Sequence, residues 1–243
     1  MKALVITPTT GSDELADAIE SVQNQTYQHV EHLLVLDGKK YESNFNKVIK
    51  NVRIKKPLHT AVLPFNTGGN GFYGHRIMAA FSHLIDHDYI LFLDQDNWYN
   101  TTHVQTLVDK LEKFNYDWVH SLRAIHNKEK EFICHDNCES LGRYPAYVNE
   151  NAFLVDTSSY LFKNEFIRKI GHIWDWGWGA DRRFFTIVKD ELQHRNFGCT
   201  GEHTLCYRLD GNDNSVTADF FVEGNKQMKE RWGDSLPWLQ KFS

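Results

Sequence analysis

The first half of the chain alternates short apolar runs with segments whose apolar residues recur at helical spacing. Five runs indicate buried strands: residues 3–7, 30–38, 60–65, 89–94 and 117–125. Between them, apolar residues recur at i, i+3, i+4 and i+7, the spacing of one helical face, over 15–22, 77–84 and 104–111. Strands that alternate with helices predict an α/β fold with a mostly parallel sheet, covered by helices on both faces.

This rhythm breaks after about residue 126. The stretch HNKEKEFICHDNCESLGRYPAYVNEN is polar and loop-rich, and we expect it to be an excursion from the sheet. Apolar and helical patterns return over 158–171 and 180–192. The chain shows no internal repeat. We therefore expect one α/β domain over residues 1–243, with a less regular second half that offers a second binding surface.

Composition narrows the class of protein. Of 243 residues, 41% are hydrophobic, which is enough for a sizeable core. The net charge of -5 argues against nucleic acid as the main partner, because phosphate binding needs a basic face. The tail KQMKERWGDSLPWLQKF is basic and aromatic; it could cover an acceptor site or touch a membrane surface, but a packed helix is the favoured interpretation.

Targeting signals and cysteines indicate a compartment. The apolar start MKALVITPTTG is too short for a signal-peptide core, and no stretch approaches the roughly 20 apolar residues of a membrane span. The cysteines do not form a disulfide scaffold and indicate reduced thiols: Cys134, Cys138, Cys199 and Cys206. With His126, the first two suggest zinc, but no second Cys pair lies nearby. We expect a cytoplasmic protein without a transmembrane segment, with peripheral membrane association as an option.

Two acids follow the fourth apolar run, at Asp94 and Asp96. On an extended backbone, residues i and i+2 face the same way, so both carboxylates can converge. Loops beyond the carboxyl ends of parallel strands are where open α/β sheets bind ligands. Two carboxylates there suit Mg²⁺ or Mn²⁺, which prefer oxygen ligands. The alternative is an acidic turn that faces water.

A glycine-rich stretch offers a competing interpretation. Gly69, Gly71 and Gly74 match G-x-G-x-x-G, lie between a strand and a helix, and precede Asp94 by the distance typical of a dinucleotide-binding fingerprint. This pattern would make the protein an NAD-binding oxidoreductase. Against it, the segment is not the first strand–turn–helix unit, and two large aromatic residues occupy the turn.

Taken in order, the motifs resemble a GT-A-fold glycosyltransferase of family 2. VITPTTG matches the first strand and its Pro-Thr turn, LLVLDG the second strand and its acid, NTGGNGFYGHR the Asn-x-Gly stretch, and YILFLDQDN the D-x-D strand. SSYLFKNEFIRKIG, WGWGADRRF and YRLDGNDNS resemble the acceptor-side and catalytic segments. The likeness spans residues 2–216. It implies a nucleotide-sugar-binding half over 1–125, an acceptor and catalytic half over 126–220, and a tail over 221–243.

The resemblance implies transfer of a sugar from a nucleotide diphosphate sugar, most simply a UDP-sugar, to a hydroxyl of a glycan, a lipid-linked saccharide or a protein, with inversion. The cofactor would be Mn²⁺ or Mg²⁺, held by Asp96 first and Asp94 second. The late segment has Asp210 where many relatives carry His, so either Asp210 or His203 is the candidate third ligand.

The resemblance also assigns donor contacts. They are Thr7, Pro8, Thr9, Asp37, Asn66, Gly68, Arg76 and Gln95, besides the paired acids. Thr7 to Thr9 would form the floor of the nucleotide site, and Asp37 would accept from a uracil imide N–H. Arg76 would pair with phosphate or orient the acids. Alternatively, Asp37 is a turn residue and Arg76 forms an ion pair with Asp94.

On the acceptor side, the resemblance makes Asp181 the catalytic base. A position at a helix N-terminus would keep it ionised, and its alternative is a helix-capping role. Trp176 and Trp178, with Asp175, are the candidates for sugar contact, and Trp174 belongs to the same alternating run. A third interpretation is a catalytically silent module that binds nucleotide sugars on the same fold.

Overall fold

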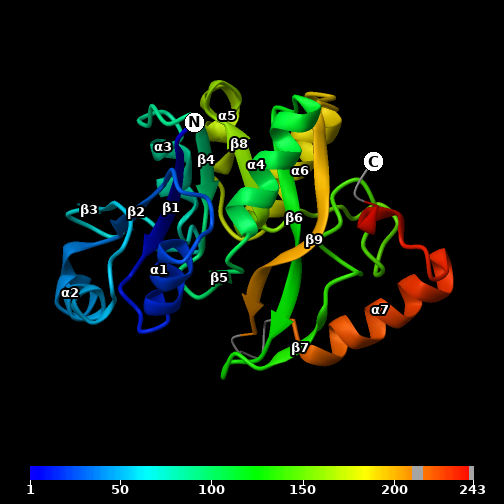
Figure 1. The fold of residues 1–243 in the computed structure, drawn as a ribbon, viewed down its shortest axis with the longest axis horizontal. Coiled ribbons are helices and arrows are strands. Elements are labelled where there is room, and N and C mark those ends of the chain that lie inside the picture. The colour runs from blue at the N-terminus through cyan, green and yellow to red at the C-terminus, as the bar shows by residue number, and fades with distance from the viewer. Residues whose placement is uncertain (210–215, 241–243) are drawn as a thin grey trace.

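The computed structural model describes residues 1–209 and 216–240. Its strands form one sheet, in the order β3-β2-β1-β4-β8-β6-β9-β5, with β7 paired to β6 (Figure 1). The strands are β1 (Ala3–Thr9), β2 (Val30–Leu36), β3 (Leu58–Val62), β4 (Tyr89–Phe92), β5 (Trp98–Tyr99), β6 (Trp118–His126), β7 (Phe132–His135), β8 (Tyr160–Lys163) and β9 (Phe197–Arg208).

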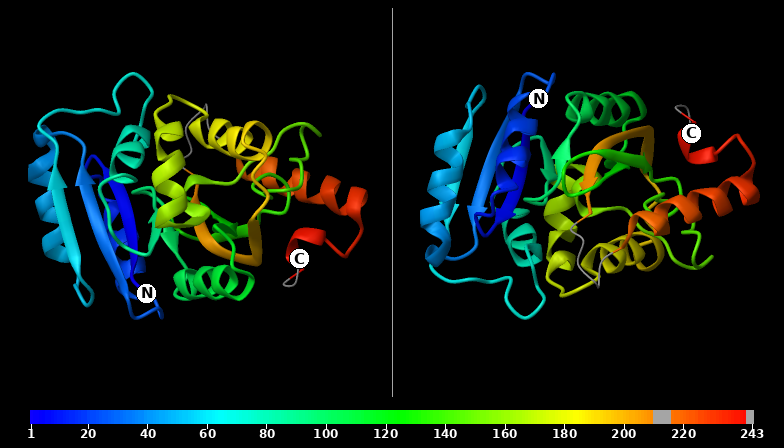
Figure 2. Two further views of the ribbon diagram at one scale, coloured as in Figure 1. Left: turned by 90° about the horizontal axis from the view of Figure 1, so that it is seen from above. Right: turned by 90° about the horizontal axis from the view of Figure 1, so that it is seen from below.

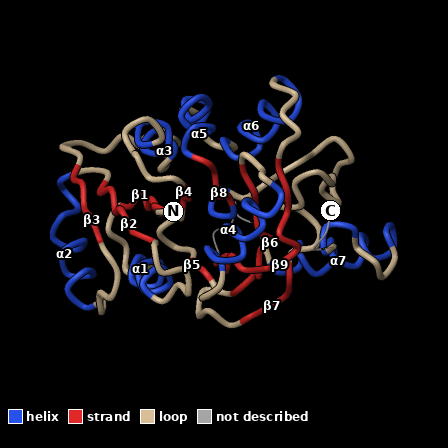
Figure 3. The backbone as a smooth tube through the Cα atoms, turned by 45° about the horizontal axis from the view of Figure 1, so that its top comes forward, coloured by secondary structure: helices blue, strands red, loops and turns tan. Residues whose placement is uncertain are grey.

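The α-helices are α1 (Leu15–Gln23), α2 (Glu42–Asn51), α3 (His75–Phe81), α4 (His103–Phe114), α5 (Asn164–Ile170), α6 (Ala180–Thr186) and α7 (Ala218–Trp232). Helices α1, α2 and α4 pack their apolar side chains into one core on one face of the sheet, and α3, α5 and α6 pack into a second core on the other face (Figure 3). This three-layer arrangement confirms the expected α/β class.

The first half of the sheet is parallel, as predicted. β1 pairs in parallel with β2 and with β4, and β2 pairs in parallel with β3. The second half is mixed, because β8 runs antiparallel to both β4 and β6. A strand is parallel or antiparallel to its neighbour according to the end of the sheet from which the chain enters it. The local spacing of apolar residues does not indicate that end.

The polar stretch after residue 126 is not an excursion from the sheet. β7 pairs with β6, and the following turns pack with β9 and α7 into a third core, which includes Cys138, Leu141, Phe221 and Met228. Figure 2 shows α7 at one end of the long axis and α2 at the other. The tail is therefore packed as favoured: α7 buries Phe221, and Trp238 beyond it is also buried.

Candidate active site

A cleft of about 610 Å³ opens at the carboxyl ends of β1, β2 and β4. One wall carries Thr9, Asp37 and Asp94, which end or follow these three strands. Asp156 and Asp181, from the second half of the chain, also line the cleft. Ligands of open α/β sheets bind at this edge. Both halves of the chain therefore contribute to one candidate site.

The paired acids Asp94 and Asp96 both line the cleft. Ser158, in the 3₁₀ turn before β8, donates its hydroxyl to Asp94 Oδ2 and accepts the Asp94 backbone N–H, each at 3.0 Å. Burial, followed by the charges of Asp96 and Asp156, raises the pKa of Asp94 to about 8. Close like charges are costly unless a cation offsets them. The site is thus electrostatically suited to a positive ligand.

Gln95 connects the acids to the end of β1. Its Oε1 accepts the Thr9 hydroxyl at 2.6 Å and the Thr10 backbone N–H at 3.0 Å. Pro8 and Thr9 line the cleft, as expected for the floor of a nucleotide site. Thr7 does not: it is fully buried behind the cleft, where its hydroxyl is hydrogen-bonded to His32 Nε2 at 2.9 Å. The expectation that Thr7 belongs to this floor is corrected.

The glycine-rich stretch 66–74 forms a loop that closes on Gly68. The Gly68 carbonyl accepts the backbone N–H groups of Phe72 and Tyr73 at 3.1 and 2.9 Å. A Cβ at Gly68 would lie 1.9 Å from the Tyr73 carbonyl oxygen, so only glycine fits there. In a dinucleotide-binding turn, backbone N–H groups point at the pyrophosphate instead. The geometry therefore does not support the oxidoreductase alternative.

Asp37 holds the start of this loop. Its Oδ1 accepts the Thr67 backbone N–H at 2.6 Å and the Thr67 hydroxyl at 2.9 Å, and its Oδ2 accepts the Gly68 N–H at 2.8 Å and Asn66 Nδ2 at 3.0 Å. A carboxylate offers about four acceptor positions. All of them are engaged here, so accepting a uracil imide N–H would require Asp37 to exchange one of these bonds.

Replacing Asp37 with Asn tests the role of this carboxylate. The amide offers fewer acceptors and adds a donor, so part of the loop's bonding is lost. We expect the affinity for UDP to fall about tenfold, because hydrogen bonds to a charged group are worth roughly 1.5–3 kcal/mol each. Isothermal titration with UDP measures this, with Asp109→Asn on the exposed face of α4 as the control. Unchanged UDP affinity would refute the role.

Arg76 and Asp175 lie beside the cleft and not in it. Arg76 Nε donates to Asp175 Oδ1 at 3.2 Å, and its guanidinium lies 3.4 Å from the centre of the Phe72 ring. Both charged residues line a neighbouring, mainly apolar groove. The alternative ion pair between Arg76 and Asp94 is not what the structure shows. In this geometry, Arg76 does not orient the paired acids.

The three tryptophans of the WDWGWG run occupy three environments. Trp174 is buried in the core, stacked on Phe184 with ring centres 4.2 Å apart. Trp176 is half exposed beneath the guanidinium of Arg183. Trp178 is 80% exposed and lines the cleft. Among the three rings, that of Trp178 lines the cleft, whereas Trp174 is packed in the core and cannot contact a ligand there.

Asp181 lies in the first turn of α6 and faces the cleft. Its Oδ1 accepts the backbone N–H of Arg182 at 2.7 Å. Burial raises the pKa of Asp181 and outweighs the lowering by this hydrogen bond and by the Arg182 charge. The pKa of Asp181 thus responds first to burial, and the expectation that its place at a helix N-terminus keeps it ionised stays a prediction. A carboxylate with a raised pKa is the better proton acceptor near neutral pH.

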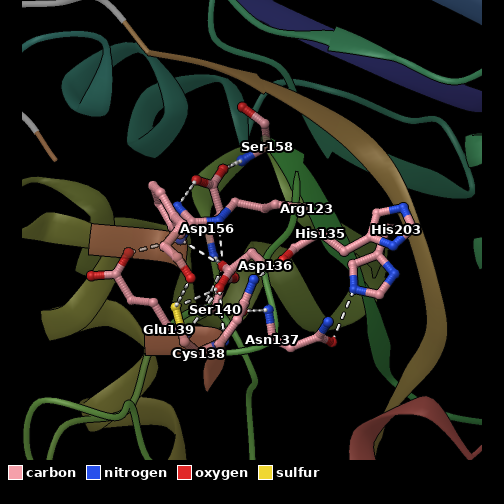
Figure 4. Close-up of polar contacts among 12 residues, drawn as sticks. Arg123, His135, Asp136, Asn137, Cys138, Glu139, Ser140, Asp156, Ser158 and His203 are labelled. Atoms are coloured by element: carbon pink, nitrogen blue, oxygen red, sulfur yellow. Dashed lines mark hydrogen bonds and ion pairs between the residues drawn. The ribbon is translucent and has the colours of Figure 1, made fainter. Parts of the chain in front are cut away.

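A buried charge network that reaches the cleft through Arg123, Glu139 and Asp156 was not predicted from the sequence (Figure 4). Arg123, in the middle of β6, is only 3% exposed. Its Nε donates to Asp136 at 2.9 Å, one terminal nitrogen donates to Asp156 at 3.0 Å, and the other donates to Glu139 at 2.7 Å. These carboxylates raise the pKa of Arg123 although burial opposes it, so the guanidinium stays charged.

The network is linked to Asp94 through Ser158 and to the neighbourhood of Asp181 through Arg182. Asp156 accepts the backbone N–H of Ser158 at 2.9 Å, and Ser158 in turn bonds to Asp94. On the other side, Glu139 accepts from Arg182, the neighbour of Asp181, at 2.5 Å. Arg123 is therefore linked, through Asp156 and Glu139, to the surroundings of both Asp94 and Asp181. A signal was present in the sequence: an Arg within an apolar strand requires buried acids as partners.

The same network explains the CHDNC segment. Asp136 accepts backbone N–H groups from Cys138, Glu139 and Ser140 at 2.9 to 3.0 Å, which closes a tight turn. The Cys138 thiol is buried and lies 3.4 Å from Asp136 Oδ1. The cysteines, all within the described residues, form no disulfide. Asp136 therefore holds a structural turn, and the zinc alternative gains no support from this geometry.

Residues 4–178 match the model of the family described as Glycosyl transferase family 2. The chain belongs to this family. Its fold resembles that of S. aureus TarS 1-349, with a TM-score of 0.59 and 14% identity, over 86% of this chain and 60% of that one. The GT-A class predicted for the fold is confirmed. No curated protein matches the sequence.

Two complexes of the same S. aureus protein show the same likeness. TarS 1-349 with UDP matches with a TM-score of 0.59 and 14% identity over 93% of this chain. TarS 1-349 with UDP-GlcNAc matches with a TM-score of 0.61 and 14% identity over 95% of this chain. This family 2 chain spans 64% and 65% of the length of those two chains.

The residues of this family 2 member fit a divalent ion at Asp94 and Asp96. The pKa of Asp94 is raised in part by the Asp96 charge, and a cation would offset this repulsion. Mg²⁺ is commonly held by one or two carboxylates together with substrate phosphates. Within residues 1–209 and 216–240, no group of three His, Cys, Asp or Glu side chains could hold a metal by itself. The remaining ligands would have to come from the substrate or from residues outside these ranges.

The two candidates for a third metal ligand have different outcomes. His203, on β9, stacks on His135 with ring centres 4.1 Å apart, and its Nε2 bonds to Asn137 Oδ1 at 3.2 Å (Figure 4). It does not line the cleft, so its assignment as a ligand is wrong. Burial lowers the pKa of His203 to about 4. Asp210 lies outside the described residues.

None of the helices in the described part of the chain is both long and apolar enough to cross a membrane.

Proposed function

We propose that this family 2 member transfers a sugar from a UDP-sugar to a hydroxyl group of an acceptor, with inversion at the anomeric carbon. The observation that carries this proposal is the placement of Asp94 and Asp96 from the first half and Asp181 from the second half in one cleft. The fold likeness to TarS, which has been solved with UDP and with UDP-GlcNAc, supports a uridine nucleotide as donor. The acceptor we propose is a glycan, a lipid-linked saccharide or a protein hydroxyl.

The chemistry needs a stronger nucleophile and a stabilised leaving group. Asp181, with its raised pKa, would accept the proton of the acceptor hydroxyl as that oxygen attacks. Trp178, exposed at the rim of the cleft, offers an apolar face to a sugar ring. Pro8, Thr9 and the loop held by Asp37 would bind the nucleotide opposite Asp181.

We further propose that Asp96 first and Asp94 second hold Mn²⁺ or Mg²⁺. Such an ion would neutralise the negative charge that develops on the departing diphosphate. Gln95 and Ser158 would keep these carboxylates in place, because both form hydrogen bonds that tie the loop after β4 to its neighbours.

Calorimetric titration with UDP, with and without Mn²⁺, tests this assignment on the wild type and on Asp96→Ala. We expect UDP to bind tightly only with Mn²⁺, and we expect Asp96→Ala to lower the affinity for UDP at least about tenfold. Loss of a residue that merely hydrogen-bonds to a metal ligand already lowers metal affinity about 10- to 100-fold. Asp86→Ala, at an acid outside the cleft, is the matched control.

The controls separate the alternatives. NAD serves as the control ligand and should not bind. NAD binding without UDP binding would overturn the proposed function. UDP binding that depends on neither Mn²⁺ nor Asp96 would refute only the metal assignment. The catalytically silent module would be supported by donor binding without turnover on any acceptor, provided that replacing Asp181 leaves donor binding unchanged.

A further inference from the structure

One segment that does not line the cleft is rich in positive charge. Seven of its 27 Lys and Arg residues, but only one of its 32 acids, lie within residues 39–56. This segment carries a formal charge of +6 in a chain with a net charge of -5. It comprises the 3₁₀ turn after β2, helix α2 and the turn that leads to β3.

These cations lie shortly before, on and shortly after α2, and together with Ile54 we call them the α2 patch. It consists of Lys39, Lys40, Lys47, Lys50, Arg53, Ile54, Lys55 and Lys56. Lys47 and Lys50 lie on the exposed side of the helix, while Phe45 and Val48 are buried in the core, and Ile54 is exposed three residues after the helix ends at Asn51. Figures 1 and 2 show α2 and β3 at one end of the long axis of the molecule.

None of these cations forms an ion pair with a residue in the described part of the chain. The nearest fixed partners are neutral: Lys55 Nζ donates to Asn24 Oδ1 at 2.5 Å, and Lys56 Nζ donates to the Tyr27 carbonyl at 3.1 Å. By contrast, Lys2, Lys130 and Lys189 each have a carboxylate within 3.1 Å. Unpaired like charges repel one another, so the α2 patch favours a negative partner.

Two features favour a planar anionic partner over an anionic polymer that serves as acceptor. The α2 patch extends to Arg53 and Lys55, which precede β3 and so lie at the amino end of this strand, away from the cleft at the carboxyl ends. An acceptor on its way to the cleft would not need these cations. In addition, Ile54 is 44% exposed between Arg53 and Lys55, as suits a side chain that enters the boundary of a lipid layer.

We propose that the α2 patch docks this protein on an anionic lipid surface, with α2 lying along the surface and Ile54 entering it. Each Lys or Arg near such a surface strengthens binding about fivefold, and salt screens the attraction. No residue of the α2 patch lines the cleft, so lipid binding and donor binding can occur together. The proposal does not depend on the reaction proposed above.

Co-sedimentation with phosphatidylcholine vesicles, with and without phosphatidylglycerol, tests the proposal. We expect the wild type to bind only the anionic vesicles, less at high salt. The variant Lys47→Gln/Lys50→Gln/Arg53→Gln should lose at least about tenfold in binding. The variant Lys128→Gln/Lys169→Gln/Lys226→Gln removes the same charge from three other exposed sites and should bind within about twofold of the wild type.

The apolar contact has its own pair of variants. Ile54→Ser should weaken binding to anionic vesicles, whereas Val222→Ser, at an apolar residue on α7 that is 54% exposed, should not. UDP titration and the thermal midpoint establish that each variant is folded. The proposal is overturned if the wild type does not bind anionic vesicles, or if both triple variants bind alike. Binding of long-chain polyphosphate through the α2 patch, without vesicle binding, would also overturn it.

Discussion

Replacing Asp181 with Asn is expected to lower kcat about 10²- to 10⁴-fold, the usual contribution of a general base. Asn has nearly the same shape and can still accept the backbone N–H of Arg182, but it cannot take a proton. The loss should therefore appear in turnover, with the affinity for UDP changed less than about threefold. Steady-state kinetics with a UDP-sugar, together with UDP titration, separate the two effects.

The matched control is Asp190→Asn. Asp190 is an exposed acid on the same helical segment, paired with Lys189. Its replacement changes the net charge equally but leaves the cleft intact, so kcat should stay within about twofold of the wild type. If Asp181→Asn retained wild-type turnover, Asp181 would not be the base.

The pH profile of the wild type provides a second readout for Asp181. A base must be ionised, so activity falls as the pH drops through its pKa. Because burial raises this pKa above the ordinary Asp value, the acidic limb of kcat should lie above the range of an exposed Asp. Asp181→Asn should lose this limb, whereas Asp190→Asn should keep it.

Replacing Arg123 with Met is expected to lower the free energy of unfolding by about 3–5 kcal/mol. The buried guanidinium is a partner of Asp136, Glu139 and Asp156, and Met would leave these acids, whose side chains are at most 8% exposed, without it. Urea unfolding at neutral pH measures the change. A loss below about 1 kcal/mol would contradict the structural role of the network.

Arg182→Met is the matched control, because Arg182 also pairs with Glu139 but is 42% exposed. An ion pair open to solvent should contribute about 1 kcal/mol or less.

The change in the free energy of unfolding with pH provides a second test of the network. In the wild type, the Arg123 charge and backbone N–H groups lower the pKa of Asp136 against the opposing effect of burial, so its contribution is present above the unfolded pKa and is lost as the pH falls. The gap between wild type and Arg123→Met should therefore narrow in acid.

The elements of the first half could be predicted from the sequence because their cause is local. The residue pattern of an element indicates which of its faces are buried. Examples are the strand 89–92, which is buried on both faces, and helix α4, which has one apolar face. The order of the motifs placed Asp94, Asp96 and Asp181 in the candidate site, and the structure brings them to one cleft. Element ends were less exact, since α3 ends at Phe81 and leaves Leu84 exposed.

The polar residues that support the site could not be placed in the same way. Arg123 reaches Asp156, 33 residues away, and Ser158 reaches Asp94, 64 residues away, through contacts that exist only after β6, β8 and the turn at 136–140 have packed together. A pattern of polar residues does not distinguish a loop in water from one that is buried and paired. For this reason, the sequence predicts that 126–151 leaves the sheet, whereas Phe132–His135 pairs with β6 and the turn at 136–140 is paired with Arg123.

The sequence by itself determined the α/β class, the family motifs and the acids of the cleft. Hydrophobic periodicity and the residue types needed for chemistry can both be identified in short stretches of the sequence. The tertiary structure alone decided the partners: that His203 stacks on His135 away from the cleft, that Arg76 faces Asp175, and that Thr7 is buried behind the site. Which buried polar groups form hydrogen bonds with one another depends on how distant segments of the chain pack. Each buried polar group needs a partner, and packing brings only a few possible partners close to it.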